Sequence, residues 1–250
     1  MTRGLAISRF APLLILALVW EGATRAQLVA SSVLPPLSDV ITSLIRMLSD
    51  DLAQQLAASL LRGMIGLGLA TAFGTAIGVL MAWYRPFRQI VKPFIELLYP
   101  LPKSALIPIA IVWLGLGNVS KVSLIFVGTM LPVIVSAFNA TRGVDQMLVW
   151  SARSVGAREP SILLEIVLPA AAPEILNGIR VALALSFILV VAGELIFANN
   201  GIGYVISMLG ESGDESGMFA GILAISLAGF AADRLFVFAT RSMTAWREQA

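Results

Sequence analysis

The sequence contains no cysteine and no histidine, and only 13% of its 250 residues are charged. Without these two residue types there can be no disulfide, no thiolate or imidazole metal site, and no Cys–His or Ser–His nucleophile pair. A soluble domain carries about 25% charged residues, so this chain has too little polar surface to coat a globule in water. We therefore expect a polytopic membrane protein with no catalytic residue and no metal site.

Long apolar stretches predict an all-α bundle of about six membrane-spanning helices. A span needs about 20 mostly apolar residues, and the chain offers candidates at 10–26, 63–84, 104–120, 122–141, 174–198 and 216–236. No repeat, low-complexity tract or long linker interrupts the sequence. A single membrane domain over residues 1–250 is expected.

The basic residues predict the orientation of these spans. With the amino terminus inside, only Arg25, Arg46, Arg62 and Lys121 of the 17 Lys and Arg residues fall on outer segments. Cytosolic segments carry the excess of Lys and Arg, so both termini are expected in the cytosol. Basic residues scattered among apolar runs do not form a nucleic-acid footprint. The alternative for the first span is a cleaved signal peptide, although Glu21 and Arg25 interrupt the region where cleavage would fall.

Small residues mark one face of the second span. Gly66, Ala70, Gly74 and Gly78 recur at intervals of four, which places them on one side of a helix. Such a stripe allows another helix backbone to approach closely. Tight helix packing is expected at this face.

Prolines interrupt the chain before and inside the third span. Pro100 and Pro102 follow an amphipathic stretch at 91–99, Lys103 comes next, and Pro108 lies within the apolar run. Proline removes a backbone donor and disfavours helix at its predecessor, so a broken entry into the membrane is expected. Non-helical backbone at that depth must be buried in protein or line a wet cavity. Pro102, Lys103 and Pro108 are candidates for a translocation path, with a structural kink as the alternative.

Glu194 is the only carboxylate placed well inside a predicted span. It lies about 21 Å along the helix axis from Arg180, short of the far edge of a bilayer core of about 30 Å. Intramembrane carboxylates usually face a cavity or a partner. Glu194 therefore either lines a translocation path or, if the helix ends early at Asn199 and Asn200, anchors the interface.

The segment at 144–168 combines apolar residues at helical spacing with turn signals. Gly156 suits a left-handed helix end and Pro160 suits a first helical turn. The segment predicts a helix, a tight turn and a second helix, with Pro169 marking the stop. A helix pair outside the bilayer that is this apolar needs something to dock against.

These residues resemble the cytosolic signature of permeases of binding-protein-dependent ABC importers. The signature is Glu-Ala-Ala, three residues, Gly, nine residues, Ile, one residue and Leu-Pro, and the matching residues are Ala152, Gly156, Ile166, Leu168 and Pro169. Further segments, at 33–40, 100–117, 142–145 and 201–206, resemble the nitrate, sulfonate (taurine) and bicarbonate branch. The resemblance covers nearly the whole chain.

The resemblance implies the type I importer-permease fold and a multi-pass protein of the bacterial inner membrane. It further implies a homodimer in lipid, two cytosolic ATPase subunits that hold ATP and Mg²⁺, and an extracytoplasmic substrate-binding protein. The solute would be a sulfonate, a nitrate-like anion or a related small compound. The residues implied for ATPase coupling are Ser151, Ala152, Arg153, Ser154, Gly156, Ala157, Glu159, Leu168 and Pro169.

The sequence departs from the signature at its start, where Trp150 and Ser151 replace the Glu and the first Ala. No GxxxxGK[ST] phosphate loop occurs, so ATP hydrolysis is expected in a partner and not in this chain. The main alternative is an ion-coupled secondary transporter in which Glu194 carries a proton. An intramembrane enzyme is the third class, and it lacks a nucleophile and a base.

Overall fold

The computed structural model describes residues 2–244, which form helices joined by short connections, with no strand in that range. The predicted domain over 1–250 therefore includes seven residues, 1 and 245–250, that lie outside the described part. The elements are α1 (Thr2–Arg25), α2 (Leu37–Ser49), α3 (Leu52–Trp83), α4 (Arg85–Leu98), η1 (Lys103–Leu106), α5 (Ile107–Leu114), α6 (Asn118–Arg142), α7 (Gln146–Ser154), α8 (Glu159–Ser161), η2 (Ile162–Val167), α9 (Leu168–Phe197), α10 (Ile202–Glu211) and α11 (Glu215–Thr244).

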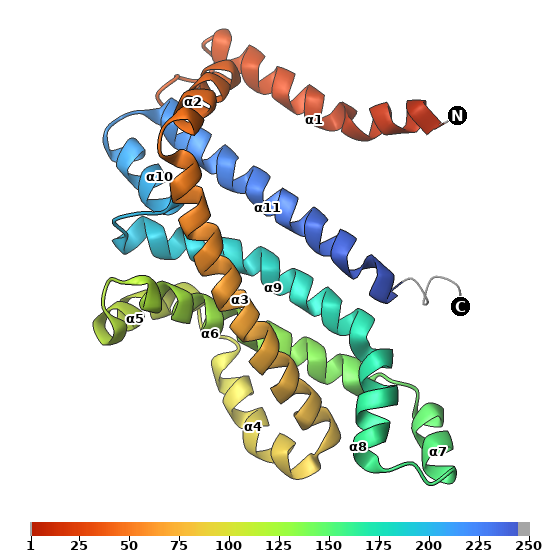
Figure 1. The fold of residues 1–250 in the computed structure, drawn as a ribbon. Helices are drawn as coiled ribbons and strands as arrows, with labels where there is room; N and C mark the ends of the chain where they lie inside the picture. Colours follow the sequence, from red (N-terminus) through yellow and green to blue (C-terminus); the bar gives the residue numbers. More distant parts are fainter. Residues whose placement is uncertain (1, 245–250) are drawn as a thin grey trace.

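Within residues 2–244, four helical segments are long and apolar enough to cross a bilayer: α3, α6, α11 and the continuous run Glu159–Ile196. The segments Arg85–Leu98 and Lys103–Leu114 together make a fifth, bent by 94°. Helix α1, with 24 residues, brings the total close to the six that the sequence predicts. The start of α1 and the end of α11 lie on the same side of the bundle as α7 (Figure 1).

The small-residue stripe of α3 packs against α6. A Cβ added at Gly66 would come within 2.7 Å of Ile125, and one added at Gly74 within 2.9 Å of Val133. Ala70, between them, is fully buried. The predicted close packing is confirmed, because only glycine or alanine allows the two backbones to approach this far.

The broken entry that the sequence predicts at the third span is confirmed, since the apolar run at 104–120 is divided among η1, α5 and the start of α6. Helix α5 covers only Ile107–Leu114 and ends at Gly115, whose φ of 77° is left-handed. Helix α6 then begins at Asn118, earlier than the expected 122. The break follows from Pro100 and Pro102, which supply no N–H to continue the hydrogen bonds of α4.

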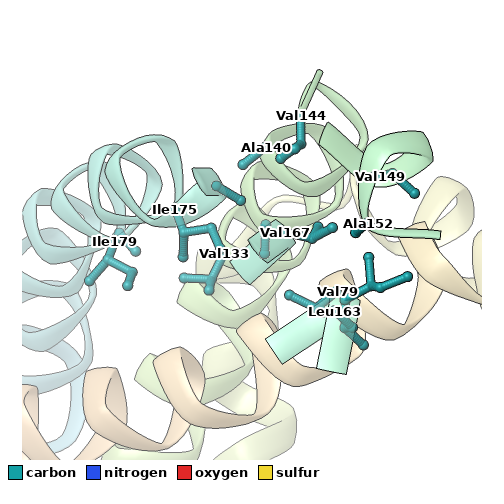
Figure 2. Packing of buried hydrophobic residues seen from close by; sticks show 14 residues of the cluster. Val79, Val133, Ala140, Val144, Val149, Ala152, Leu163, Val167, Ile175 and Ile179 are labelled. Carbon is teal, nitrogen blue, oxygen red and sulfur yellow. The ribbon is translucent and has the colours of Figure 1, made fainter. Parts of the chain in front are cut away.

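A buried apolar core joins the segment 144–168, which the sequence predicts to lie in the cytosol, to the spans. Val79 of α3, Val133 of α6, Val149 of α7 and Ile175 of α9 belong to this cluster (Figure 2). Ile162 and Val167 of η2 are almost completely buried within it. Apolar side chains such as Leu18, Leu235 and Phe238 are instead exposed on α1 and α11, as expected of surfaces in contact with lipid.

Candidate functional site: the coupling segment and the ionic cluster

Helix α7 opens the segment 144–168, called the coupling segment below. It begins where the Asp145 side chain accepts a hydrogen bond from the Met147 N–H at 2.9 Å, as an N-cap residue does. Val149 and Ala152 face inward and are buried in the apolar core. Trp150 and Val155 point outward and are 59% and 82% exposed. The helix thus has one face fixed to the bundle and one apolar face that is uncovered.

The turn after α7 has the geometry that the sequence predicts. Gly156 has φ 81°, and the Ala157 N–H donates to the Ala152 carbonyl at 3.1 Å. This is the hydrogen bonding of a left-handed helix end, which glycine adopts without a steric penalty. Pro160 stands in the first turn of α8. The predicted helix, turn and second helix are confirmed.

An ion pair closes the same turn. The Arg153 guanidinium donates to both carboxylate oxygens of Glu159, at 2.7 and 3.0 Å. This hydrogen bonding raises the pKa of Arg153 further above its ordinary value, so the guanidinium stays charged. The guanidinium also lies 6.0 Å from the centre of the Trp83 ring, at the end of α3. Both charged side chains are about half exposed, which leaves them accessible to a partner.

The prediction that Pro169 stops the second helix is wrong. The chain continues from α8 through the π-helical turn η2 into α9, and Pro169 lies in the first turn of α9. The Leu168 N–H donates to the Leu163 carbonyl, five residues back. This five-residue spacing, typical of a π-helix, ends one residue before Pro169. The hydrogen-bond spacing of the helix therefore changes at the position where Pro169 has no N–H to donate.

The residues expected to couple to an ATPase lie around this turn, except Leu168 and Pro169, which begin α9 after η2, and they differ in exposure. Ala152 is buried, and Ala157 and Leu168 are partly buried. The exposed members are Ser151, Arg153, Ser154, Gly156, Glu159 and Pro169. The Ser154 hydroxyl donates to the Ser151 carbonyl at 2.7 Å. The exposed members form the accessible surface, whereas the others fix it to the bundle.

Glu194 lies at the other end of α9, in a buried ionic cluster. Its carboxylate pairs with Arg62 of α3, and the side chains of Glu194 and Arg62 are only 1% and 5% exposed. The Ser59 hydroxyl donates to it at 2.7 Å and the Gly203 N–H at 3.0 Å. We call Arg62, Glu194, Ser59, Asn118 and Asn200 the ionic cluster.

The other nitrogens of Arg62 have partners as well. Its Nε donates to the Asn118 side chain at 2.8 Å, and its terminal nitrogens donate to the side chain and carbonyl of Asn200. Gly201, with φ 108°, sits directly against the Glu194 carboxylate, where a Cβ would collide. The cluster therefore joins α3, α6, α9 and α10 through a charge that is fully compensated within the chain.

The other three residues predicted for a translocation path lie at the bend between α4 and α5. The Lys103 ammonium donates to the carbonyls of Leu98, Tyr99 and Leu101, which have lost their helical partners. Pro102 precedes η1, and Pro108 stands in the first turn of α5; both prolines are exposed. Lys103 thus stabilises the bend between α4 and α5. Glu194 does not join these three residues but belongs to the ionic cluster.

Arg62 is the functional residue that the sequence reasoning missed, since it was counted only as an outer basic residue. One local signal was available. Ser59 and Arg62 are three residues apart on a helix, hence on one face, directly before an apolar run. A second was the Asn-Gly pair at Asn200 and Gly201, which predicts a turn. Neither signal indicates that both would meet Glu194.

Comparison with known proteins identifies the family. Residues 74–245 match the family described as binding-protein-dependent transport system inner membrane component. The chain belongs to this family. The permease is 34% identical to the taurine transport system permease protein TauC of Escherichia coli, over 94% of this chain and 87% of that protein. It is 32% identical to the aliphatic sulfonates transport permease protein SsuC of Bacillus subtilis, described as putative, over 94% and 86%.

Solved structures show that the permease has the importer-permease fold. An inward-facing MetNI methionine ABC transporter chain superposes with a TM-score of 0.67 at 18% identity, covering 77% of this chain and 95% of that chain. A second MetNI crystal form gives a TM-score of 0.61. The expected fold class and the expected permease family are both confirmed. Among the described residues, no group of three or more Asp or Glu side chains could hold a metal ion.

Proposed function

We propose that the permease works as a homodimer, clasped by two ABC ATPases at the coupling segment and supplied by an extracytoplasmic binding protein, to import a small organosulfonate. The printed functions of TauC and SsuC, taurine and aliphatic sulfonate transport, support this substrate class. A formylaminopyrimidine transport permease is also a relative, at 27% identity. ATP and Mg²⁺ would be held by the ATPases, because the permease has no phosphate loop.

The exposed apolar face of α7 is the observation that carries the proposal. Met147 and Trp150 of α7 and Val155, the residue that follows it, are 65%, 59% and 82% exposed outside the spans. Apolar surface of this kind marks a protein interface when lipid is not there to cover it. Aromatic side chains such as Trp150 are the usual anchors of such interfaces. Trp150 stands at the position where the family signature has a glutamate, so aromatic packing would replace a charged contact there.

The buried face of α7 explains how docking would move the spans. Val149 and Ala152 share one packed core with Val79 of α3, Val133 of α6 and Ile175 of α9 (Figure 2). Packed cores transmit displacement because they have few voids to absorb it. Closure of the ATPase dimer would therefore tilt these three helices together, alternating the permease between inward-open and outward-open states.

We propose that the permease is oriented in the membrane as its Lys and Arg residues predict, with both termini in the cytosol. The described ends of α1 and α11 lie on the side of α7 (Figure 1). Placing α7 in the cytosol therefore puts both helix ends there as well. The outer segments then carry α2, α10 and the acidic connection with Glu211, Asp214 and Glu215.

The ion-coupled secondary transporter is not favoured. The permease belongs to a binding-protein-dependent family, which needs no proton carrier in its membrane subunit. Glu194 is held in an ion pair with Arg62 and is 1% exposed. The same carboxylate accepts hydrogen bonds from the Ser59 hydroxyl and the Gly203 N–H, so its contacts are taken up within the chain, between helices.

Reconstitution tests the proposal. The permease would be purified with its ATPase, placed in proteoliposomes, and assayed for ATP hydrolysis with the binding protein loaded with taurine, an alkanesulfonate, nitrate or a formylaminopyrimidine. The proposal expects stimulation by a sulfonate-loaded binding protein and little stimulation by the other two. Stimulation by nitrate alone would contradict the substrate class, and ATP hydrolysis without any association with the permease would contradict the coupling role.

A further inference from the structure

A polar cavity of about 660 Å³ lies beside the coupling segment, between the end of α3, the start of α4 and the end of α6. The side chains that matter for its chemistry are Arg85, Arg88, Thr141, Arg142, Arg153 and Glu159. The coupling segment used in the proposed transport cycle forms one wall of this cavity through Val149, Arg153 and Glu159, but no step of that cycle places a ligand inside it. Its lining differs from the other large cavity of similar volume, between α9 and α11, which is lined mainly by apolar residues.

The cavity carries an excess of positive charge. Four arginines line it, and the one carboxylate among the lining residues, Glu159, is already bonded to Arg153. Within the described residues, Arg85 and Arg142 form no ion pair with a carboxylate. Uncompensated arginines with planar, forked donors are suited to the oxygens of a phosphate.

Two of these arginines are held in place. Arg88 donates to the Met81 and Ala82 carbonyls, both at 2.8 Å, which fixes it at the end of α3. The guanidiniums of Arg88 and Arg142 lie 5.4 and 5.6 Å from the centre of the same ring, Phe138. Both distances are within the range of a cation–π interaction, which positions each guanidinium without neutralising its charge.

A buried hydroxyl without a partner gives a second, independent indication of a ligand. Thr141 lines the cavity and is only 5% exposed. Its Oγ1 has no hydrogen-bond partner among the described residues. Buried hydroxyls nearly always have a partner. The Oγ1 atom exposes less than 1 Å², so a rotation about χ1 would be needed before a ligand oxygen in the cavity could complete its hydrogen bonding.

The position of the cavity matches the depth of lipid headgroups. Trp83 ends the α3 span, Tyr84 follows it, and both residues line the cavity. Tryptophan and tyrosine concentrate at the membrane–water interface. Basic pockets between spans on the cytoplasmic side bind anionic headgroups by charge and hydrogen bonding.

We propose that this cavity binds a phosphate group, with Arg85 and Arg142 supplying charge and Thr141 a hydrogen bond. The phosphate can come from the headgroup of an anionic lipid or from a free anion. An anion held here would bridge α3, α4 and α6 next to the turn at Gly156 and so stabilise the coupling segment. The proposal does not depend on the transported solute.

Native mass spectrometry of the full-length permease tests binding and distinguishes the two sources. The permease is purified in detergent, then exposed to phosphatidylglycerol or to phosphatidylcholine, with and without excess inorganic phosphate. Retention of phosphatidylglycerol that phosphate does not displace indicates the lipid source. Displacement by inorganic phosphate indicates that the phosphate group alone is recognised. Equal retention of both lipids together with no effect of phosphate would overturn the proposal.

Three variants locate the binding. Arg85→Gln and Arg142→Gln should each weaken phosphatidylglycerol binding about fivefold, from the usual contribution of one arginine near a charged headgroup. Thr141→Val keeps the side-chain shape and should weaken it by about tenfold if the hydroxyl donates to the anion. Arg46→Gln is the matched control, since Arg46 is an exposed arginine on α2, at the other end of the bundle (Figure 1).

The outcome is decisive even if one variant folds poorly. Thr141→Val removes a hydroxyl that has no partner within the described residues, so an empty cavity would leave the permease as stable or make it more stable. Weaker phosphatidylglycerol binding in this variant and in both arginine variants, with Arg46→Gln unchanged, supports the site. Losses that are equal in Arg46→Gln and Arg142→Gln would show only a general charge effect and would overturn it.

Discussion

The ionic cluster and the coupling segment lie at opposite ends of α3 and α9. The ion pair of the first is buried, whereas the ion pair of the second is exposed. Arg62 and Glu194 are 5% and 1% exposed and have all their hydrogen bonds within the chain. Arg153 and Glu159 are 47% and 53% exposed and stand beside the uncovered Trp150. The difference indicates that the first site holds four helices in place, whereas the second is left open for a partner.

The largest effect is expected from breaking the ionic cluster. Glu194→Ala leaves Arg62 as a buried charge without its counter-ion, which costs about 3–5 kcal/mol of stability. Unfolding of the detergent-solubilised permease by heat or denaturant measures this loss. In the matched variant Glu159→Ala the loss should stay below about 1 kcal/mol, because that pair is exposed. Equal losses of stability in Glu194→Ala and Glu159→Ala would contradict the difference between a structural ionic cluster and an open coupling segment.

A double variant sharpens the same comparison. Arg62→Met with Glu194→Leu removes both charges together and should recover part of the stability lost in Glu194→Ala, because a buried apolar pair carries no uncompensated charge. A double variant less stable than the single one would show that the neighbouring polar groups of Ser59 and Asn200, now without partners, dominate the cluster.

The next effect concerns binding and not stability. Trp150→Ala should weaken the affinity of the ATPase for the permease in nanodiscs by about 30-fold, the usual cost of about 2 kcal/mol for a central aromatic anchor. Trp113→Ala is the control, since Trp113 is 81% exposed but lies on α5, away from α7. If both variants bind the ATPase as tightly as the native permease, the exposed face of α7 is not the docking surface.

Backbone strain at the turn gives a smaller effect with a close control. Gly156→Val places a branched residue at φ 81°, which costs about 1–3 kcal/mol locally and should distort the turn. The amount of ATPase that copurifies with the permease should fall. Gly213→Val imposes the same strain at φ 76° in the connection before α11. A similar fall in ATPase copurification with Gly213→Val would contradict a specific role for the turn.

The smallest effect is expected from the exposed ion pair itself. A double-mutant cycle of Arg153→Ala and Glu159→Ala should give a coupling energy for folding of about 0.2–1 kcal/mol, as exposed pairs do. The measurement is the free energy of unfolding of the four proteins. A coupling above about 2 kcal/mol would indicate that the pair supports the turn as strongly as Arg62 supports the ionic cluster.

Features set by neighbouring residues could be predicted from the sequence. The turn at Gly156 follows from a glycine before a proline-initiated helix, and the close packing of α3 follows from four small residues on one face. The family signature at Ala152, Gly156 and Leu168 identified the fold and the permease role. In each case the physical cause lies within one or two helical turns.

Features set by distant contacts could not be predicted. Arg62 and Glu194 are 132 residues apart in the chain, and nothing in either local sequence states that the two will meet. Pro100 and Pro102 predicted a break, but the bend of 94° depends on how α4 and α5 pack. Pro169 was taken as a helix end because a π-helical turn, which accommodates the proline, has no simple sequence pattern.

The central claim is that a separate ATPase drives this permease through the coupling segment. Uptake of labelled taurine into proteoliposomes tests it most directly, using the permease alone or with its ATPase and binding protein, under either enclosed ATP or an imposed proton gradient. The account predicts accumulation only with all three proteins and ATP, and its loss with Gly156→Val. Accumulation by the permease alone on the proton gradient would contradict it.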